Sequence, residues 1–428
     1  MRIVVAVHLV LALAVGPASS AAAPVPRGLA ADSSGTLTGV LTGRDDGQPV
    51  PYGTVLVVET GEERFADASG AFRLSGIVPG TYTVRARQIG YAPRDTIIEI
   101  AAAPAVTSVS ITLARLPILL NTVRVQGHRP DKCVSAGIPD SAADPALAGL
   151  FAQLEENVDR YRLLMQQYPF QFSREEQRYT RYDANRTPRD VRESADTTTL
   201  DSGTRRPYRI GNILYHDTDA RGIRRLYMYV PTFGELGDSA FLAAHCFRYG
   251  GTVSAPGSAG VDLIRLDFVP LASIKQPDVS GSVYLDAQRL IVRRAVFGLT
   301  NPDAVHPSVI AFKVTTVFRE LVPLVPLMVS IETEQPLDGH PGAGFSPGQS
   351  PEPEDSAETK RQARDAESPT REAINRYRVL DVHFMQSPIG KLTSNSLPWP
   401  STQPDTDSRS RGHPSAPASR PGSPPTSR

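Results

Sequence analysis

The chain has 428 residues, and its 45 Lys and Arg residues are balanced by 45 Asp and Glu residues. A formal net charge of zero excludes a chain-wide basic surface of the kind that binds nucleic acid or anionic lipid. The length is sufficient for two or three domains with sizeable cores. The 38 prolines are more than one compact domain uses, so we expect linkers and tails to hold many of them.

Residues 1–23 have the pattern of a secretory signal peptide. Arg2 precedes the apolar run Ile3–Val15, which is too short to span a bilayer, and the small residues Ala18–Ala23 offer cleavage positions. An uncleaved anchor is the alternative. No later stretch is long and apolar enough to cross a membrane. We therefore expect an exported protein with no transmembrane segment in the mature chain, located in the periplasm, at the cell surface or at the outer membrane.

Cys133 and Cys246 are the two cysteines of the chain. In an oxidising compartment, two cysteines most simply form one disulfide. Because this bridge closes a long loop, the chain-entropy model predicts a stabilisation of about 4–5 kcal/mol. Two buried free thiols are the alternative.

Residues 35–116 have the alternation and turn composition of a small β-sandwich. Polar and apolar residues alternate in Thr81–Arg87 and in Ser108–Ala114, and the apolar run Thr54–Val58 favours a strand buried on both faces. The stretch Asp67-Ala-Ser-Gly70 predicts a turn in which the Asp carboxylate accepts from the backbone and the Gly takes a positive φ. Six or seven short strands between Gly and Pro turns predict a sandwich.

A connector over 117–143, with one expected strand at Thr122–Gln126, leads to a helix predicted over 144–169. Asp144 can cap this helix and Pro145 fits its first position. Apolar residues recur along it at helical spacing and predict packing against a core: Leu147, Leu150, Phe151, Leu154, Val158, Tyr161 and Leu164.

A second, β-rich domain is predicted over 170–336. Its expected strands are Ile210–His216, Arg225–Val230, Val261–Phe268, Gly281–Asp286, Leu290–Leu299, Ile310–Phe318 and Leu327–Thr333. The tetrapeptide Asp286-Ala-Gln-Arg predicts a hairpin turn. We expect a short helix at Phe241–Phe247 carrying Cys246, and a long mobile loop at Asn185–Arg206.

The last quarter of the chain is predicted to be mostly disordered. Residues 337–370 are rich in Gly, Pro, Ser, Glu and Asp, and residues 387–428 are rich in Pro, Ser and Arg. Residues 371–386 recover an alternation of apolar and polar residues, which predicts one last strand.

Turn glycines and inward-facing apolar residues recur over residues 36–115: Gly39-Val40, Pro49, Val55, Asp67-Ala-Ser-Gly70-Ala-Phe72, Leu74, Pro79-Gly80-Thr-Tyr82-Thr-Val84 and Gly90-Tyr91. With these residues the stretch resembles the carboxypeptidase regulatory-like family of transthyretin-like β-sandwiches. The resemblance implies a fold and no activity, because the matching positions are structural. Related domains occur beside metallocarboxypeptidases, before outer-membrane transporters and in large surface proteins.

The second domain is similar, over Ala240–Arg248, Gly281–Asp286 and Val292–Phe297, to the C-terminal part of uncharacterised bacterial envelope proteins. No activity is assigned to those relatives, so the resemblance implies none for this chain. We expect a curved antiparallel sheet with a helix across it, like the half-barrels of periplasmic lipoprotein carriers.

Motifs for catalysis and metal binding are missing or weak. No His has a Glu at the third following position, as a zinc peptidase requires, and His216-Asp-Thr-Asp219 is more typical of a turn than of a metal site. No G-x-S-x-G pentapeptide occurs. Gly237-Asp-Ser239 is similar to the nucleophile block of a lipase-like family, but it precedes a helix that Asp or Ser would cap. We expect no catalytic centre, no metal and no cofactor.

Three groups of residues remain as candidate ligand contacts. Arg224, Arg225 and Tyr227 could form a basic and aromatic patch, and so could Arg293 and Arg294. The alternative for each of these two groups is the solvated face of a strand. Tyr82 and Tyr91 could stack on a sugar, although the family to which the first domain is similar uses these aromatics as core or corner residues.

The sequence thus predicts a mainly β protein with an N-terminal transthyretin-like sandwich, followed by an α+β domain with a curved antiparallel sheet and one long helix. The predicted function is non-catalytic binding or assembly at the cell envelope, with a glycan, a peptide or a protein as partner and no nucleic acid. One alternative is a hydrolase in the second domain, with Ser239, Asp238 and His245 as its first candidates. Another is a lipid or lipoprotein carrier built on a half-barrel.

Overall fold

The computed structural model describes residues 34–116, 132–182, 188–199, 208–211, 213–218, 224–228, 233–254, 262–301, 313–336 and 371–387. Several predictions lie outside these residues: the signal peptide, the strand at Thr122–Gln126, the linker at 337–370 and the tail from residue 388.

The N-terminal domain is a sandwich of two sheets with strand orders β4-β1-β7 and β3-β2-β5-β6. Its strands are β1 (Gly35–Gly43), β2 (Thr54–Val57), β3 (Glu62–Phe65), β4 (Ala71–Ile77), β5 (Gly80–Arg87), β6 (Arg94–Ile100) and β7 (Val106–Leu113). Alternate residues of both sheets fill one core, which includes Leu37, Val55, Val84 and Ile111. The alternation read from the sequence therefore marks the buried faces correctly.

The turn before β4 forms as the sequence predicts. Asp67 Oδ1 accepts hydrogen bonds from the backbone N–H of Ser69 (2.8 Å) and of Ala71 (3.0 Å). Gly70 has a φ of +76°, a conformation that glycine adopts without strain. The pKa of Asp67 lies below its ordinary value, chiefly because the Ser69 hydroxyl donates to the carboxylate.

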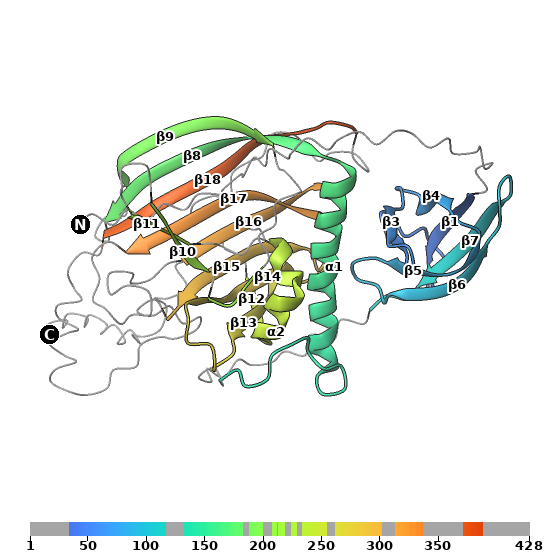
Figure 1. The fold of residues 1–428 in the computed structure, drawn as a ribbon, viewed down its shortest axis with the longest axis horizontal. Helices are drawn as coiled ribbons and strands as arrows, with labels where there is room; N and C mark the ends of the chain where they lie inside the picture. The colour runs from blue at the N-terminus through green and yellow to red at the C-terminus, as the bar shows by residue number, and fades with distance from the viewer. Residues whose placement is uncertain are drawn as a thin grey trace, which may run out of the picture.

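The long helix α1 (Pro145–Gln167) stands between the sandwich and the second domain (Figure 1). Asp144 caps it, since its side chain accepts from the N–H of Leu147 at 2.9 Å, and Pro145 occupies the first turn. Phe151, Leu154 and Val158 are buried in the core that the helix shares with the large sheet.

The second domain is built on a nine-stranded antiparallel sheet with the order β12-β13-β14-β15-β16-β17-β18-β8-β9. These strands are β8 (Phe170–Tyr182), β9 (Pro188–Thr199), β12 (His245–Ser254), β13 (Asp262–Pro270), β14 (Asp278–Asp286), β15 (Val292–Thr300), β16 (Lys313–Val322), β17 (Val325–Pro336) and β18 (Arg371–Phe384). A separate hairpin pairs β10 (Leu214–Thr218) with β11 (Arg224–Met228), and two short helices, η1 (Phe233–Gly237) and α2 (Ser239–Ala244), precede β12.

The sheet is curved, with β8 and β9 bending most strongly, and α1 crosses the ends of its strands (Figure 1). The face toward α1 and α2 carries the main core, to which β13 contributes Ile264, Leu266 and Phe268. A mainly β protein with a sandwich, a curved antiparallel sheet and one long helix confirms the predicted fold class.

Two local predictions for the second domain are wrong. The expected loop at Asn185–Arg206 contains β9, which pairs along β8. Its polar composition suggested a loop, but backbone pairing with β8 supplies hydrogen bonds whatever the side chains are. The expected helix at Phe241–Phe247 ends at Ala244, so Cys246 lies on β12 and not on the helix.

Candidate functional site

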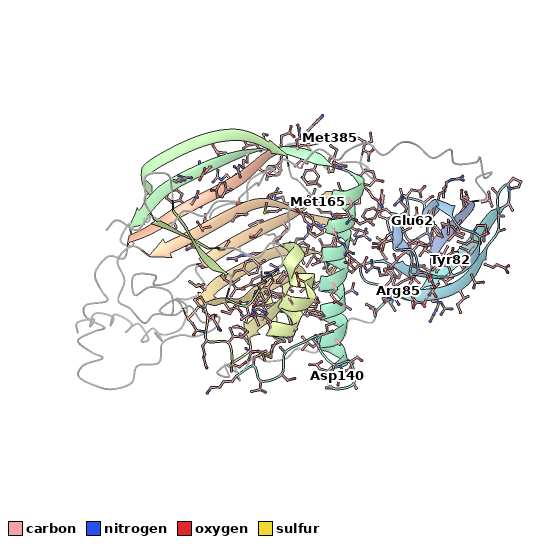
Figure 2. All side chains as sticks on the ribbon, viewed as in Figure 1. Glu62, Tyr82, Arg85, Asp140, Met165 and Met385 are labelled. Atoms are coloured by element: carbon pink, nitrogen blue, oxygen red, sulfur yellow. A yellow bond between two sulfur atoms is a disulfide. The ribbon has the colours of Figure 1, made fainter. Side chains whose placement is uncertain are left out.

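Of the aromatic candidates, Tyr82 lies near the start of β5, and Tyr91 lies beyond the end of that strand, where it forms an isolated bridge with Arg115. The Tyr82 hydroxyl donates to the carbonyl of Val78 at 2.7 Å, and in Figure 2 the residue lies within the sandwich, away from α1. The Tyr91 ring lies under the guanidinium of Arg115, 5.3 Å from ring centroid to Cζ. Both rings pack against the sandwich core. They act as core and corner residues and do not form one stacking platform.

The basic candidates lie on the β10–β11 hairpin. Its register places Arg224 opposite Thr218, Arg225 opposite Asp217 and Tyr227 opposite Tyr215. His216, from the weak metal motif, lies on β10 opposite Leu226. Among the described residues, no group of three or more His, Cys, Asp or Glu side chains could hold a metal ion.

The residues of the hydrolase alternative do not form a nucleophile and base pair. Asp238 caps α2 by accepting from the N–H of Ala240 at 2.8 Å, and Ser239 is exposed in the first turn. His245 is fully buried, with Nδ1 2.9 Å from the carbonyl oxygen of Phe241 and Nε2 3.0 Å from that of Val279. Because both ring nitrogens face backbone carbonyls, His245 has no nitrogen directed at Ser239.

His245 instead belongs to a closed polar cluster in the core. Its Nε2 lies 3.7 Å from Asp278 Oδ1, and the other carboxylate oxygen accepts from the Tyr208 hydroxyl at 2.5 Å. Phe241 stacks on the imidazole with a centroid distance of 3.9 Å. Burial lowers the pKa of His245 and raises the pKa of Asp278. The cluster anchors α2 to β14 and exposes no part of its imidazole or carboxylate to a substrate.

The predicted disulfide joins Cys133 to Cys246, across a sequence separation of 113 residues. It holds the segment 132–138 beside the first residues of β12, where the N–H of Gly137 donates to the carbonyl of His245 at 3.1 Å. Val134 and Ile138 of this segment are 84% and 61% exposed. The segment is therefore attached by the bridge and by backbone hydrogen bonds rather than by apolar side chains.

An extended arrangement of polar side chains lies on α1, between the two domains. One side of the helix carries buried polar residues at positions i, i+3, i+4 and i+7: Gln153, Glu156, Asn157 and Arg160. Sequence reasoning missed this polar stripe. The spacing is visible in the sequence, but the same pattern is typical of a solvent-facing helix surface.

The polar stripe attaches the sandwich to the helix. Gln153 Oε1 accepts from the N–H of Gly90 at 2.7 Å, and Arg160 Nη2 donates to the carbonyl of Tyr52 at 2.6 Å. About two turns beyond the stripe, Gln167 donates to the carbonyl of Glu63 at 2.6 Å. These contacts extend over about four turns of helix.

Arg87, on β5, is the centre of an ion cluster at this junction. Its guanidinium contacts Glu63 Oε1 at 2.5 Å and Asp159 Oδ2 at 2.6 Å, and Glu156 Oε2 lies 3.4 Å away. Burial alone would lower the pKa of Arg87, but the three carboxylates outweigh it and raise this pKa. Burial raises the pKa of Glu156 and lowers the pKa of Arg160.

Two apolar side chains of the sandwich complete the junction. Ile89 belongs to the core that α1 shares with the large sheet, and Phe65 belongs to a smaller core with Leu163, Leu164 and Met165 of α1. With polar bonds between these two apolar contacts, the junction resists both sliding and rotation of the sandwich on the helix.

The face of the large sheet opposite the main core carries charged and aromatic side chains, and we call it the polar sheet face. Its members are Arg265, Asp267, Tyr284, Arg294, Lys313, Glu334, Glu332, Arg376 and Tyr179, which the strand register places in neighbouring rows. Arg265 pairs with Asp267 at 3.0 Å and Lys313 with Glu334 at 2.9 Å, and Arg376 pairs with Glu332.

Two tyrosines of the polar sheet face lie next to arginines. The guanidinium of Arg294 lies 5.6 Å from the ring centroid of Tyr284, and that of Arg376 lies 5.6 Å from the ring of Tyr179. In each pair the guanidinium lies over one face of the ring, as it does in the Arg115–Tyr91 pair, and holds its hydrogen-bond donors in a fixed plane there.

The described helices include none that is long and apolar enough to cross a membrane.

Comparison with solved structures finds chains of several kinds at low identity. A chain of a type II cohesin–X-dockerin complex from Acetivibrio cellulolyticus is 18% identical, with 27% of this chain and 84% of that chain covered and a TM-score of 0.16. A candidate carbohydrate-binding protein from Bacteroides uniformis is 10% identical, covering 56% of this chain and 92% of that one, also with a TM-score of 0.16. These TM-scores are too low to support any inference about function.

A candidate membrane-associated protein of unknown function from Bacteroides fragilis covers 81% of this chain and 98% of its own, at 9% identity and a TM-score of 0.16. No curated protein matches the chain. A family model does match: that of the carboxypeptidase regulatory-like domain, over residues 36–114. Residues 36–114 are therefore a carboxypeptidase regulatory-like domain, a β-sandwich of the transthyretin-like type.

Proposed function

We propose that the protein is a non-catalytic binding module of the cell envelope, and that it binds a glycan polymer on the polar sheet face. The observation that carries the proposal is the pairing of Tyr284 with Arg294 and of Tyr179 with Arg376 on this face. Sugar rings stack on aromatic rings through their C–H groups, while guanidinium and carboxylate groups bond their hydroxyls.

The ion pairs of the polar sheet face support this function because they hold the ligand-contacting groups in place before binding. Arg265 is bonded to Asp267, whose Oδ1 also accepts from the Ser282 hydroxyl at 2.5 Å. A surface that is ordered in advance loses less conformational entropy when a ligand binds. A neighbouring row with Lys313 and Glu334 extends the surface along the strands.

The junction on α1 holds the sandwich in a fixed orientation relative to the large sheet. The sandwich is fixed to the helix through Gln153, Arg160 and Gln167, and the helix packs on the same sheet that carries the proposed site. In this proposal the carboxypeptidase regulatory-like domain acts as a rigid spacer or as a second contact to the envelope.

The test uses the mature chain, residues 24–428, and isolated envelope polysaccharides and peptidoglycan, with retention measured by co-sedimentation. Arg294→Ala is the test variant, and Arg115→Ala is its matched control, because Arg115 lies over a tyrosine ring of the sandwich in the same geometry. The proposal predicts that Arg294→Ala loses most of the retention and that Arg115→Ala keeps it.

Other outcomes would replace the proposal. Loss of retention only in Arg115→Ala would move the glycan site to the sandwich. Retention of a protein or peptide instead of a polymer would support a protein or a peptide as the binding partner. Lipid that co-purifies with the chain would support the carrier, and ester or peptide turnover that survives purification would support an enzyme.

A further inference from the structure

A β-bulge in β15 places two consecutive arginines outside the main core. The register between β14 and β15 shifts at this point, so that Arg293 has no residue opposite it on β14. Val292 and Ala295, on either side of the arginine pair, are both buried in the main core. A bulge inserts one residue into a strand and redirects a side chain. Arg293 and Arg294 therefore both lie on the side of the polar sheet face.

Arg319 lies on the same face, on the neighbouring strand β16. Alternate residues of β16 from Lys313 to Arg319 face one side of the sheet, because successive side chains of a strand point to opposite sides. The register pairs Arg294 with Val317, two positions before Arg319, and Arg293 is near enough to repel Arg319 electrostatically. We call Arg293, Arg294 and Arg319 together the arginine corner.

The carboxylates beside the arginine corner are bonded to other groups than Arg319. Arg293 contacts Asp286 Oδ2 at 3.1 Å and lies 3.9 Å from Glu320 Oε2. Arg289, in the β14–β15 turn, bonds both carboxylate oxygens of Glu320, at 2.6 and 2.8 Å. Within the part of the chain that the structure describes, the Arg319 side chain has neither an ion pair nor a hydrogen bond. Burial, and after it Arg293, lower the pKa of Arg319.

This arrangement is suited to a negatively charged ligand. A partly buried guanidinium beside a like charge is unfavourable unless something supplies the opposite charge. Each guanidinium also holds its donors in a planar fork that matches two oxygens of a carboxylate or a phosphate. The side chain of Arg293 is 27% exposed, so an anion can reach the arginine corner from solvent.

We propose that the arginine corner is an anion-binding subsite, and that the polymer bound on the polar sheet face is an acidic glycan with carboxylate or phosphate groups. This inference rests on the proposed function and adds the charge of the ligand to it. Arg294 joins the two parts of the site, because it lies over the ring of Tyr284 and also belongs to the arginine corner. Elsewhere on this face Lys313 is paired with Glu334, so that row contributes no net charge.

The experiment uses the chain of residues 24–428 and envelope polysaccharide separated by anion exchange into a neutral and an acidic fraction. Co-sedimentation measures the retention of each fraction. The wild type should retain the acidic fraction about tenfold or more better than the neutral one, because charge-assisted hydrogen bonds to arginine form only with the former. Chemical reduction of carboxyl groups, or removal of phosphodiesters with hydrofluoric acid, then identifies the anion, since one of the two treatments should abolish retention.

The test variant is Arg319→Gln, which removes the charge and the fork. It should lower retention of the acidic fraction about tenfold. Arg319→Lys, which keeps the charge without the fork, should restore part of the retention. The control is Arg73→Gln, which removes the same charge from an exposed position on β4 of the sandwich and should keep the wild-type retention.

Two failures are distinguishable. Equal retention of both fractions by the wild type, or equal losses in Arg319→Gln and Arg73→Gln, would overturn the anion subsite and leave glycan binding in place. Retention of neither fraction would overturn the proposed function and this inference with it. The comparison of the two fractions uses the wild type alone, so it does not depend on the folding of any variant.

Discussion

The side chain of Asn157 in α1 bonds the backbone of Leu290, 133 residues further along the chain. Its Nδ2 donates to the Leu290 carbonyl at 2.8 Å, and its Oδ1 accepts from the N–H of Val292 at 3.0 Å. Leu290 has a φ of +55°, which a branched residue adopts only when its surroundings hold it. One buried amide thus fixes the β14–β15 turn against the helix.

Replacing Asn157 should destabilise the protein strongly. In Asn157→Ala the Leu290 carbonyl and the Val292 N–H remain buried without a partner, which costs about 2–4 kcal/mol. Urea denaturation followed by circular dichroism measures the loss. Gln166→Ala, an exposed residue on the same helix, is the control and should change stability by less than about 0.5 kcal/mol. Equal effects of the two substitutions would contradict the role given to Asn157.

Reduction of the Cys133–Cys246 bridge should lower stability by about 4–5 kcal/mol, because the unfolded chain regains the freedom of a long loop. It should also release the segment 132–138, whose apolar side chains Val134 and Ile138 face solvent. Hydrogen exchange with and without reductant measures both effects. An intact mass that gains two thiol-alkylation adducts without reduction would show that the bridge is absent.

Asp67 should make the sandwich acid-sensitive. Because the folded-state pKa of Asp67 is lowered, chiefly by the Ser69 hydroxyl, its contribution is present above the unfolded pKa and is lost as the pH falls through the folded one. Asp67→Ala should therefore lower the thermal midpoint at neutral pH and flatten the acid limb of the stability profile. Asp45→Ala, at an exposed position of the neighbouring turn, should leave both unchanged.

Asp238, which caps α2, should contribute to folding, and neither Asp238 nor Ser239 should contribute to turnover. Asp238→Ala removes the cap of α2 and should cost about 1 kcal/mol, whereas Ser239→Ala should be close to neutral. Neither should change the hydrolysis of ester or peptide substrates, measured against a buffer blank. If the wild type hydrolyses such a substrate and Ser239→Ala does not, the result would support the hydrolase alternative.

The sandwich could be predicted in detail because a local residue pattern specifies each of its turns and strands. Asp67 and Gly70 specify a turn, and alternation in Thr81–Arg87 specifies a strand with one buried face. Asp144 and Pro145 specify the start of α1 in the same way. Such signals are local, so they do not depend on which element lies across the core.

The missed strands and the missed junction have a common physical cause. Polar and charged residues are frequent in β8 and β9. The pairing of these two strands therefore depends on the neighbouring strand and not on an apolar face that the sequence would reveal. Glu156 and Arg160 belong to a polar helix stripe that differs from a solvated one only through its partners, Arg87 and Tyr52. Contacts between residues far apart in sequence are not encoded in local pattern.

The position of β18 determines the order in which the protein can assemble. This strand lies between β17 and β8, and it pairs with β8 from Phe384 opposite Phe170 to Arg371 opposite Tyr182. During synthesis the sandwich can close as soon as β7 is complete, since all its strands are local. By contrast, the β8–β9 hairpin joins the rest of the large sheet only through β18, which is made about two hundred residues after β8, and such a long-range closure slows folding. Chains truncated before Arg371 should therefore carry a folded sandwich beside an open, aggregation-prone sheet.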